Sequence, residues 1–137
     1  MRAFATVLVT AVVAALAAEA PLIQPKDLAG QLAAKARPAI FQVGPNLMYR
    51  SRRIPGAIYA GQASRPDGLN LLRSAVEKLA RDRDIVLYCG CCPWDNCPNI
   101  SPAMAMLKQM GFTRVKALYL ANNFKADWTD RGYPVEP

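Results

Sequence analysis

All four cysteines of the chain fall within nine consecutive positions of the segment YCGCCPWDNCPNISP, at residues 88–102. Prolines at positions 93 and 98 stiffen this segment. Thiols this close together can form a disulfide, bind a soft metal, or supply a nucleophile with helper groups. The candidate nucleophile is Cys89, and the candidate site loop after it comprises Gly90, Cys91, Cys92, Trp94, Asp95, Asn96, Cys97 and Ser101.

The composition removes several kinds of site. The chain has no histidine among its 137 residues, which excludes a Cys-His dyad, a Ser-His-Asp triad and any metal site that requires imidazole. A formal net charge of +7 favours small anionic partners. Because the sequence has no run of Lys and Arg with interleaved aromatic residues, we expect no nucleic-acid partner.

The N-terminal residues, MRAFATVLVTAVVAALAAEA, have the pattern of a secretory signal peptide. Arg2 precedes an apolar stretch of roughly 16 residues, which is short of the ~20 needed to span a bilayer. Small residues at Ala15 and Ala17 predict cleavage after Ala17. We therefore expect a signal peptide at 1–17, a single domain at 18–137, and a periplasmic or secreted protein that has no membrane attachment after cleavage.

Apolar runs alternate with helical periodicities along the rest of the chain. This alternation predicts an α/β fold with a parallel sheet and helices on both faces. Strands are expected at residues 39–43, 85–89 and 115–120, with a short apolar segment at 57–59 after a Pro-Gly turn. Helices are expected from near Pro25, after a cap at Asp67, at 102–110 after a cap at Ser101, and at 124–131.

Cys89 ends the run IVLYC, the expected central strand, and the loop after it leads into the helix at 102–110. Open α/β folds place ligand sites at such strand ends. Unpaired N–H groups and the dipole of the helix stabilise an anion there, which predicts a lowered pKa for the Cys89 thiol without a neighbouring base. The alternative is that Cys89 only fills space in the core.

Four segments together resemble the rhodanese-like sulfurtransferase domain, in order and in spacing. They are IPGAIYAG at 54–61, IVLYC at 85–89, MLKQMGFTRVKAL at 106–118 and ADWTDRGYPVE at 126–136. The resemblance covers most of the chain after the leader and implies the rhodanese-like fold. It also implies a persulfide on Cys89, a small anionic sulfur donor such as thiosulfate, a thiol acceptor or redox partner protein, and no cofactor.

The chain departs from the family pattern around this cysteine. The Asp and Arg of the family's first strand fall on Gln42 and Gly44, and the His of its His-Ile-Pro-Gly-Ala motif falls on Arg53. The loop is several residues longer, and its only charge is Asp95, at the position where related phosphatases and arsenate reductases need an Arg. That carboxylate would repel an oxyanion. Anion-binding charge could come instead from Arg50, Arg52 and Arg53, or these residues could form only a solvated rim.

Three roles remain open for the other three cysteines. A Cys92–Cys97 or Cys91–Cys97 disulfide would staple the loop, whereas a Cys89–Cys91 bridge would be strained. Soft thiolates suit Cu(I), Zn or an iron-sulfur cluster, but the spacing C-x-C-C-x4-C matches no common metal site, and no metal is predicted. In the third role, one cysteine attacks sulfane sulfur held on Cys89, while a stapled loop directs N–H groups at the persulfide.

The expected function is therefore an exported sulfurtransferase of the thiosulfate or polysulfide type, which carries sulfane sulfur on Cys89 and passes it to a thiol or another acceptor. The alternative is a non-catalytic, thiol-rich module on the same fold. Such a module would bind a soft metal or act as a thiol/disulfide redox protein.

Overall fold

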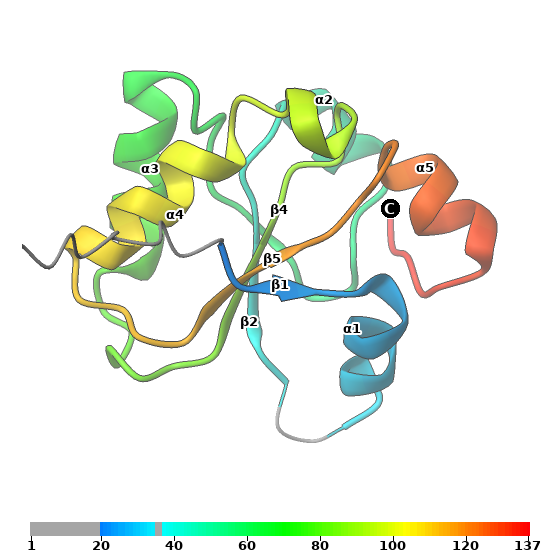
Figure 1. The fold of residues 1–137 in the computed structure, drawn as a ribbon, viewed down its shortest axis with the longest axis horizontal. Coiled ribbons are helices and arrows are strands. Elements are labelled where there is room, and N and C mark those ends of the chain that lie inside the picture. Colours follow the sequence, from blue (N-terminus) through cyan, green and yellow to red (C-terminus); the bar gives the residue numbers. More distant parts are fainter. Residues whose placement is uncertain (1–19, 35–36) are drawn as a thin grey trace, which may run out of the picture.

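A five-stranded parallel sheet forms the centre of the molecule. The computed structural model describes residues 20–34 and 37–137, so the predicted leader at 1–17 lies outside the described residues. The strands are β1 (Leu22–Ile23), β2 (Ala39–Gln42), β3 (Ile58–Tyr59), β4 (Ile85–Tyr88) and β5 (Val115–Leu118). Their order across the sheet is β1-β5-β4-β2-β3, with every pair parallel (Figure 1). The predicted parallel sheet is confirmed.

Strand β4 lies at the middle of the sheet and is paired on both sides. Its Leu87 is in register with Phe41 of β2 and with Ala117 of β5. All four of its residues are buried, as expected of a continuous apolar run in a parallel sheet. The end of β4 is therefore the most constrained position at the carboxyl edge of the sheet.

Helices cover both faces of the sheet. They are α1 (Pro25–Leu32), α2 (Asn46–Ser51), α3 (Pro66–Val76), α4 (Ile100–Gln109) and α5 (Phe124–Asp127). Helices α3 and α4 lie on one side, and α1 and α5 lie on the other (Figure 1). Among the described residues, no helix is long and apolar enough to cross a membrane.

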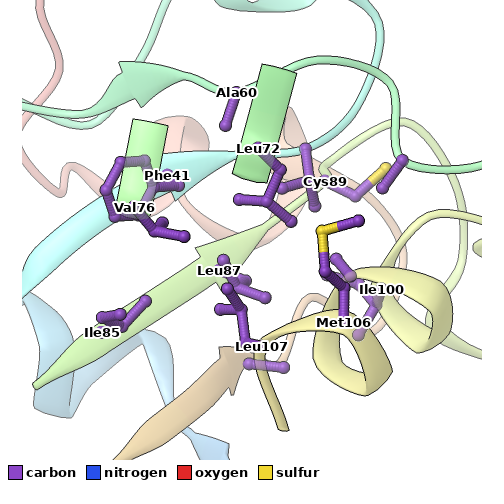
Figure 2. Packing of buried hydrophobic residues seen from close by; sticks show 14 of the residues in the cluster. Phe41, Ala60, Leu72, Val76, Ile85, Leu87, Cys89, Ile100, Met106 and Leu107 are labelled. Atoms are coloured by element: carbon purple, nitrogen blue, oxygen red, sulfur yellow. The ribbon is translucent and has the colours of Figure 1, made fainter. Parts of the chain in front are cut away.

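The two faces have separate cores, and the alternation of side chains along β4 divides its residues between them. Ile85 and Leu87 pack with α3 and α4, whereas Val86 and Tyr88 pack on the face of α1 and α5. Cys89 continues the first series, so its side chain enters the core under α3 and α4, as Figure 2 shows.

Two predicted helix caps are wrong. Helix α3 begins at Pro66 after Arg65, which places Asp67 in the first turn. Helix α4 begins at Ile100 after Asn99, so Ser101 lies inside the helix and is exposed. In both cases the helix starts earlier than the side-chain cap signal indicates, and the residue before the helix makes no side-chain cap.

Two short elements were not predicted. Strand β1 has two residues and exists through its pairing with β5, which joins Leu22 to Ala117 in register. Helix α2 lies in a segment for which no helix was predicted, and none of its residues is buried.

The C-terminal helix is shorter than predicted. The helix expected at 124–131 is interrupted at Trp128, after which the chain forms a 3₁₀ turn at Thr129–Arg131. Such short elements depend on tertiary contacts rather than on local pattern.

Two glycines in helices provide a matched test of the packing. A Cβ on Gly68 in α3 would collide with the carbonyl oxygen of Gln62, whereas a Cβ on Gly30 in α1 would meet nothing within 4 Å. We expect Gly68→Ala to lower the free energy of unfolding by about 2 kcal/mol or more. Gly30→Ala should raise it by roughly 0.5–1 kcal/mol, because alanine loses less chain entropy in a helix. Urea unfolding followed by circular dichroism measures both, and equal stabilities would contradict the close contact at Gly68.

Candidate functional site

Cys89 lies directly after β4, where the chain turns towards the loop, and its side chain is only 4% exposed. The turn depends on Gly90, which has a φ of 80°. A Cβ at this position would lie 2.8 Å from the Cβ of Phe124, whose N–H donates a hydrogen bond to the Gly90 carbonyl at 3.1 Å. Only glycine satisfies both the backbone angle and the close contact.

The Cys89 sulfur accepts a hydrogen bond from a buried amide. The Nδ2 group of Asn99 donates to Cys89 Sγ at 3.2 Å. The Oδ1 atom of Asn99 accepts the backbone N–H of Ser64 at 2.8 Å, which fixes the amide with its NH₂ group towards the sulfur. Asn99 is the residue before α4 and is only 1% exposed. It therefore supplies an oriented hydrogen-bond donor, inside the core, that would stabilise an anionic form of the Cys89 sulfur.

Gln42 and Gly44, which stand where the family pattern has Asp and Arg, both lie against Cys89. The Gln42 Nε2 group donates to the Cys89 carbonyl at 3.0 Å, while its Oε1 atom is buried and has no hydrogen-bond partner among the described residues. A Cβ on Gly44 would lie 2.9 Å from Cys89 Sγ. Gly44 thus brings bare backbone up to the sulfur, where a side chain has no room.

The loop disulfide joins Cys91 to Cys92, which are adjacent in the sequence. The predicted Cys92–Cys97 and Cys91–Cys97 staples are therefore wrong. The physical reason is that β4 and α4 hold the two ends of the loop, which brings the sulfur atom of Cys97, three residues before α4, within 4.8 Å of that of Cys89. Cys89 and Cys97 both remain thiols, and Cys89 Sγ lies 3.3 Å from Cys91 Sγ.

Cys89 and Cys97 form a coupled pair of thiols. A hydrogen bond from the Cys89 thiol lowers the pKa of Cys97 to about 6, and the backbone N–H groups of Asn99 and Ile100 lower it further, against the effect of burial. The same hydrogen bond, together with burial, raises the pKa of Cys89. The pair therefore holds one proton near neutral pH, on the buried Cys89.

The N–H groups at the start of α4 lower a thiol pKa, as predicted, but the thiol is that of Cys97 and not that of Cys89. The sequence predicted a lowered pKa for Cys89, and the structure lowers the pKa of Cys97 instead. Cys97 lies nearer to the first N–H groups of α4 and is only partly buried, so its charged form is favoured there. Removing the charge on Cys97, for example by a bond to its sulfur, would remove the largest cause of the raised pKa of Cys89.

A small cavity of ≈ 10 Å³ adjoins the sulfur atoms. This is about the space that one water-sized atom fills. The residues that line it are Cys89, Gly90, Cys92, Trp94, Cys97, Ile100, Leu118 and Leu120. No cation is among them.

Trp94 closes the cavity from the loop. It belongs to a 3₁₀ turn, η1 (Trp94–Asn96), and its ring lies 5.4 Å from the ring of Tyr119, centroid to centroid. Its backbone N–H donates to the carbonyl of Ala121 at 3.2 Å, which ties the loop to the segment after β5. Asp95 and Asn96 of the same turn are exposed and do not line the cavity.

The three predicted anion-binding arginines lie elsewhere. Arg53 forms an ion pair with Glu136 at 3.2 Å, and its guanidinium carbon lies 4.7 Å from the centre of the Tyr49 ring. Arg50 is exposed at the end of α2. Arg52 lines a separate hollow beside α5. None of them lines the cavity at Cys89.

Sequence reasoning found the sulfur atoms of the site but not the polar groups that hold them. Asn99 and Ser64 were missed, while Gln42 and Gly44 were noted only as departures from the family pattern and given no role at the sulfur. Asn99 was not predicted because the sequence placed the helix cap at Ser101, two residues after the observed boundary residue. The usable signal was a lone Asn between Pro98 and an apolar helix, which is typical of a residue at a helix boundary.

Comparison with known proteins gives the fold a name. Neither a family model nor a curated protein matches the sequence. A crystal structure of the Alr3790 protein from Anabaena sp. superposes with a TM-score of 0.63 and 25% identity, over 83% of this chain and 81% of that one. A solution structure of the rhodanese-like domain of the same protein gives a TM-score of 0.62 and 25% identity, over 85% and 78%.

A more distant likeness is to EanB, seen in a Cys→Ser variant in complex with hercynine. Its TM-score is 0.60 and its identity 22%, over 86% of this chain but only 28% of the EanB chain, so it bears on the fold alone. The protein has the rhodanese-like fold. This fold, with a cysteine cluster at the end of its central strand, supports a sulfur-transfer or thiol-related module.

The coupled pair predicts which thiol reacts first. With the Cys91–Cys92 disulfide intact, iodoacetamide should alkylate Cys97 before Cys89, because the thiolate is the reactive form. The rate should rise between roughly pH 5 and pH 7 and then level off, unlike that of an ordinary thiol with a pKa of ~8.5. Peptide mass spectrometry over a pH series measures it.

The Cys89→Ala variant is the control for this titration. It removes the S–H donor, so the midpoint for Cys97 should move to higher pH. Faster labelling of Cys89 than of Cys97 in the unsubstituted protein would contradict the assignment of the charge.

Proposed function

We propose that the protein is an exported sulfurtransferase that carries sulfane sulfur as a persulfide on Cys89. The observation that carries the proposal is the setting of Cys89 Sγ, at the end of the central strand, 3.2 Å from the amide donor of Asn99 and beside a cavity of ≈ 10 Å³. That space holds about one water-sized atom, and an added sulfur atom would occupy it. The amide of Asn99 donates to Cys89 Sγ, which carries the negative charge when Cys89 attacks as a thiolate.

Cys97 would serve as the entry thiol. It is partly exposed, whereas Cys89 is buried, and it is the thiolate of the pair near neutral pH. In the first step, the Cys97 thiolate attacks the outer sulfur of a persulfide donor R–S–SH. A new S–S bond forms on Cys97, the S–S bond of the donor breaks, and R–S⁻ leaves with the electron pair.

The second step moves the sulfur inwards. Once Cys97 carries sulfur, its sulfur atom no longer bears the charge that raised the pKa of Cys89, so Cys89 can ionise. The Cys89 thiolate attacks the outer sulfur of the Cys97 persulfide, giving a Cys89 persulfide and a Cys97 thiolate. An acceptor thiol receives the sulfur by the reverse sequence. No external oxidant or reductant is consumed.

The lining of the cavity favours particular donors. Thiosulfate carries two negative charges, and among residues 20–34 and 37–137 no Lys or Arg lines the cavity to bind them. A thiol-bound persulfide or a polysulfide brings less charge density to the sulfur. We therefore expect these donors to load the protein faster than thiosulfate does. A thiol or a redox partner protein is the proposed acceptor.

Cyanolysis tests the carrier residue. Protein incubated with polysulfide and desalted should release about one equivalent of thiocyanate on addition of cyanide, which removes the outer sulfur of a persulfide. In Cys89→Ser any sulfur taken up stays on Cys97, and less than about a tenth of an equivalent should survive desalting, because that partly exposed persulfide lacks the buried setting of Cys89. Cys97→Ser should still become loaded, but at least tenfold more slowly. If Cys89→Ser retained the sulfur and Cys97→Ser lost it, Cys97 would be the carrier.

Asn99→Asp tests the amide donor in the same assay. Asp keeps an oxygen that accepts the N–H of Ser64 but has no group to donate to Cys89 Sγ. Loading should fall at least tenfold while the far-ultraviolet circular dichroism spectrum is unchanged, as expected for loss of a donor that stabilises developing charge. Unchanged loading would show that Asn99 has only a structural role.

Export is the remaining part of the proposal, and it is supported by the apolar leader and its small residues at 15 and 17. Expression of the full chain in a bacterium should yield a protein that begins at Ala18 and is recovered from the periplasm. Intact-mass spectrometry of the periplasmic fraction measures this. A full-length protein retained in the membrane fraction would contradict cleavage.

A further inference from the structure

Three sulfur atoms of the site lie close enough to share one ion. The Sγ atoms of Cys89, Cys91 and Cys97 are all within 4.8 Å of one another. Cys89 directly follows β4, whereas Cys91 and Cys97 both lie in the loop before α4, with Cys97 at the end of the 3₁₀ turn η1. The end of β4 and the η1 turn thus hold two of the three positions, which limits the reorganisation needed to bind an ion.

We propose that reduction of the Cys91–Cys92 disulfide converts this cluster into a three-thiolate site for Cu(I). In the disulfide form, Cys91 is bonded to Cys92 and cannot act as a thiolate ligand. Two equivalents of a thiol reductant convert the disulfide into two cysteine thiols and are oxidised to one external disulfide. Each of the three ligating thiols then releases its proton to solvent when it binds the metal.

The spacing fits an ion at the centre of the three sulfur atoms. A metal–sulfur distance of about 2.3 Å places three sulfur atoms about 4 Å apart around a trigonal ion. Cys89 and Cys91 are 3.3 Å apart in the disulfide form, and the whole cluster lies within 4.8 Å. Side-chain movements of less than about 1 Å therefore complete the triangle.

The ligand chemistry favours Cu(I) over Zn²⁺. Soft thiolates select Cu(I), which accepts three sulfur ligands, whereas structural zinc sites almost always have four ligands. The chain has no histidine to supply a fourth, and the sulfur atom of Cys92, although freed by reduction, is not part of the cluster. Asp95, the nearest acidic residue in the loop, is exposed and is not part of the cluster.

The surroundings can hold the negative charge of such a complex. Three thiolates and one Cu(I) carry a net charge of −2. The backbone N–H groups of Asn99 and Ile100 face Cys97, and the Asn99 side chain donates to Cys89. Donors of this kind around a metal site orient the ligands and stabilise their charge. Because Cys89 would be a ligand, a bound Cu(I) would exclude sulfane sulfur from the same atom.

Adjacent cysteines provide a matched pair of variants. Cys91→Ser and Cys92→Ser both abolish the disulfide, but only Cys91→Ser removes a proposed ligand. Each protein is reduced, desalted without oxygen, and titrated with Cu(I) against the coloured chelator bathocuproine disulfonate. The unsubstituted protein is measured in both its reduced and its disulfide form.

We expect the reduced protein and Cys92→Ser to bind one Cu(I) with similar affinity. The disulfide form, Cys91→Ser and Cys97→Ser should each bind at least tenfold more weakly. Bound Cu(I) should also protect Cys89 from alkylation. Equal affinities of Cys91→Ser and Cys92→Ser would overturn the proposal, as would loss of binding in Cys92→Ser, which would make Cys92 a ligand.

Zinc provides a second check. A parallel titration with Zn²⁺ should show weaker binding than Cu(I) in Cys92→Ser, and preference for Zn²⁺ would overturn the three-sulfur assignment. Circular dichroism spectra that coincide with that of the unsubstituted protein show that the variants are folded. The sulfane assay uses metal-free protein, so a failure of Cu(I) binding and a failure of sulfur transfer are distinguishable.

Discussion

Strand β4 is hydrogen-bonded to β2 on one side and to β5 on the other, and its last residues occupy the middle of the carboxyl edge of the sheet. Because both neighbours are parallel to it, β4 cannot shift its register without breaking both ladders. The same alternation that buries Ile85 and Leu87 under α3 and α4 sends Cys89 into that core. This pairing sets the position and direction of the Cys89 side chain. Asn99, Gln42 and Gly44 are arranged around it.

A buried thiol is a poor anion, and the structure offsets this cost in two ways. An oriented amide, Asn99, contacts the sulfur directly, and its partner Ser64 prevents it from turning its oxygen towards the charge. A second thiol, Cys97, holds the charge near the surface until it reacts. Neutral donors take the place of a cation, in a cavity that no Lys or Arg of the described part of the chain lines. This arrangement suits a small soft sulfur species better than a hard oxyanion, since dipoles stabilise a single buried charge without requiring a counter-ion.

The loop between β4 and α4 sets the reactivity of the other cysteines. Its disulfide joins neighbours, so it closes almost no loop and removes little chain entropy. Its contribution is chemical: while the disulfide is intact, Cys91 lies in the sulfur cluster without a thiolate, and reduction restores one. Trp94, packed on Tyr119, lines the cavity beside these sulfur atoms. One fold thereby presents two thiols in one redox state and four in the other.

The sequence by itself determined the parallel α/β architecture, the place of Cys89 at the end of the central strand, and the clustering of the four thiols, because apolar runs, glycines and cysteine spacing are local patterns. Short elements such as β1 and α2 could not be predicted, since they form only against their neighbours. The tertiary structure alone decided which cysteines pair and which thiol carries the charge. Those outcomes depend on distances between β4, the loop and α4, and on where the first N–H groups of α4 point. Asn99, Gln42 and Gly44 became part of the site for the same reason: burial and contact with one sulfur atom are properties of the assembled fold.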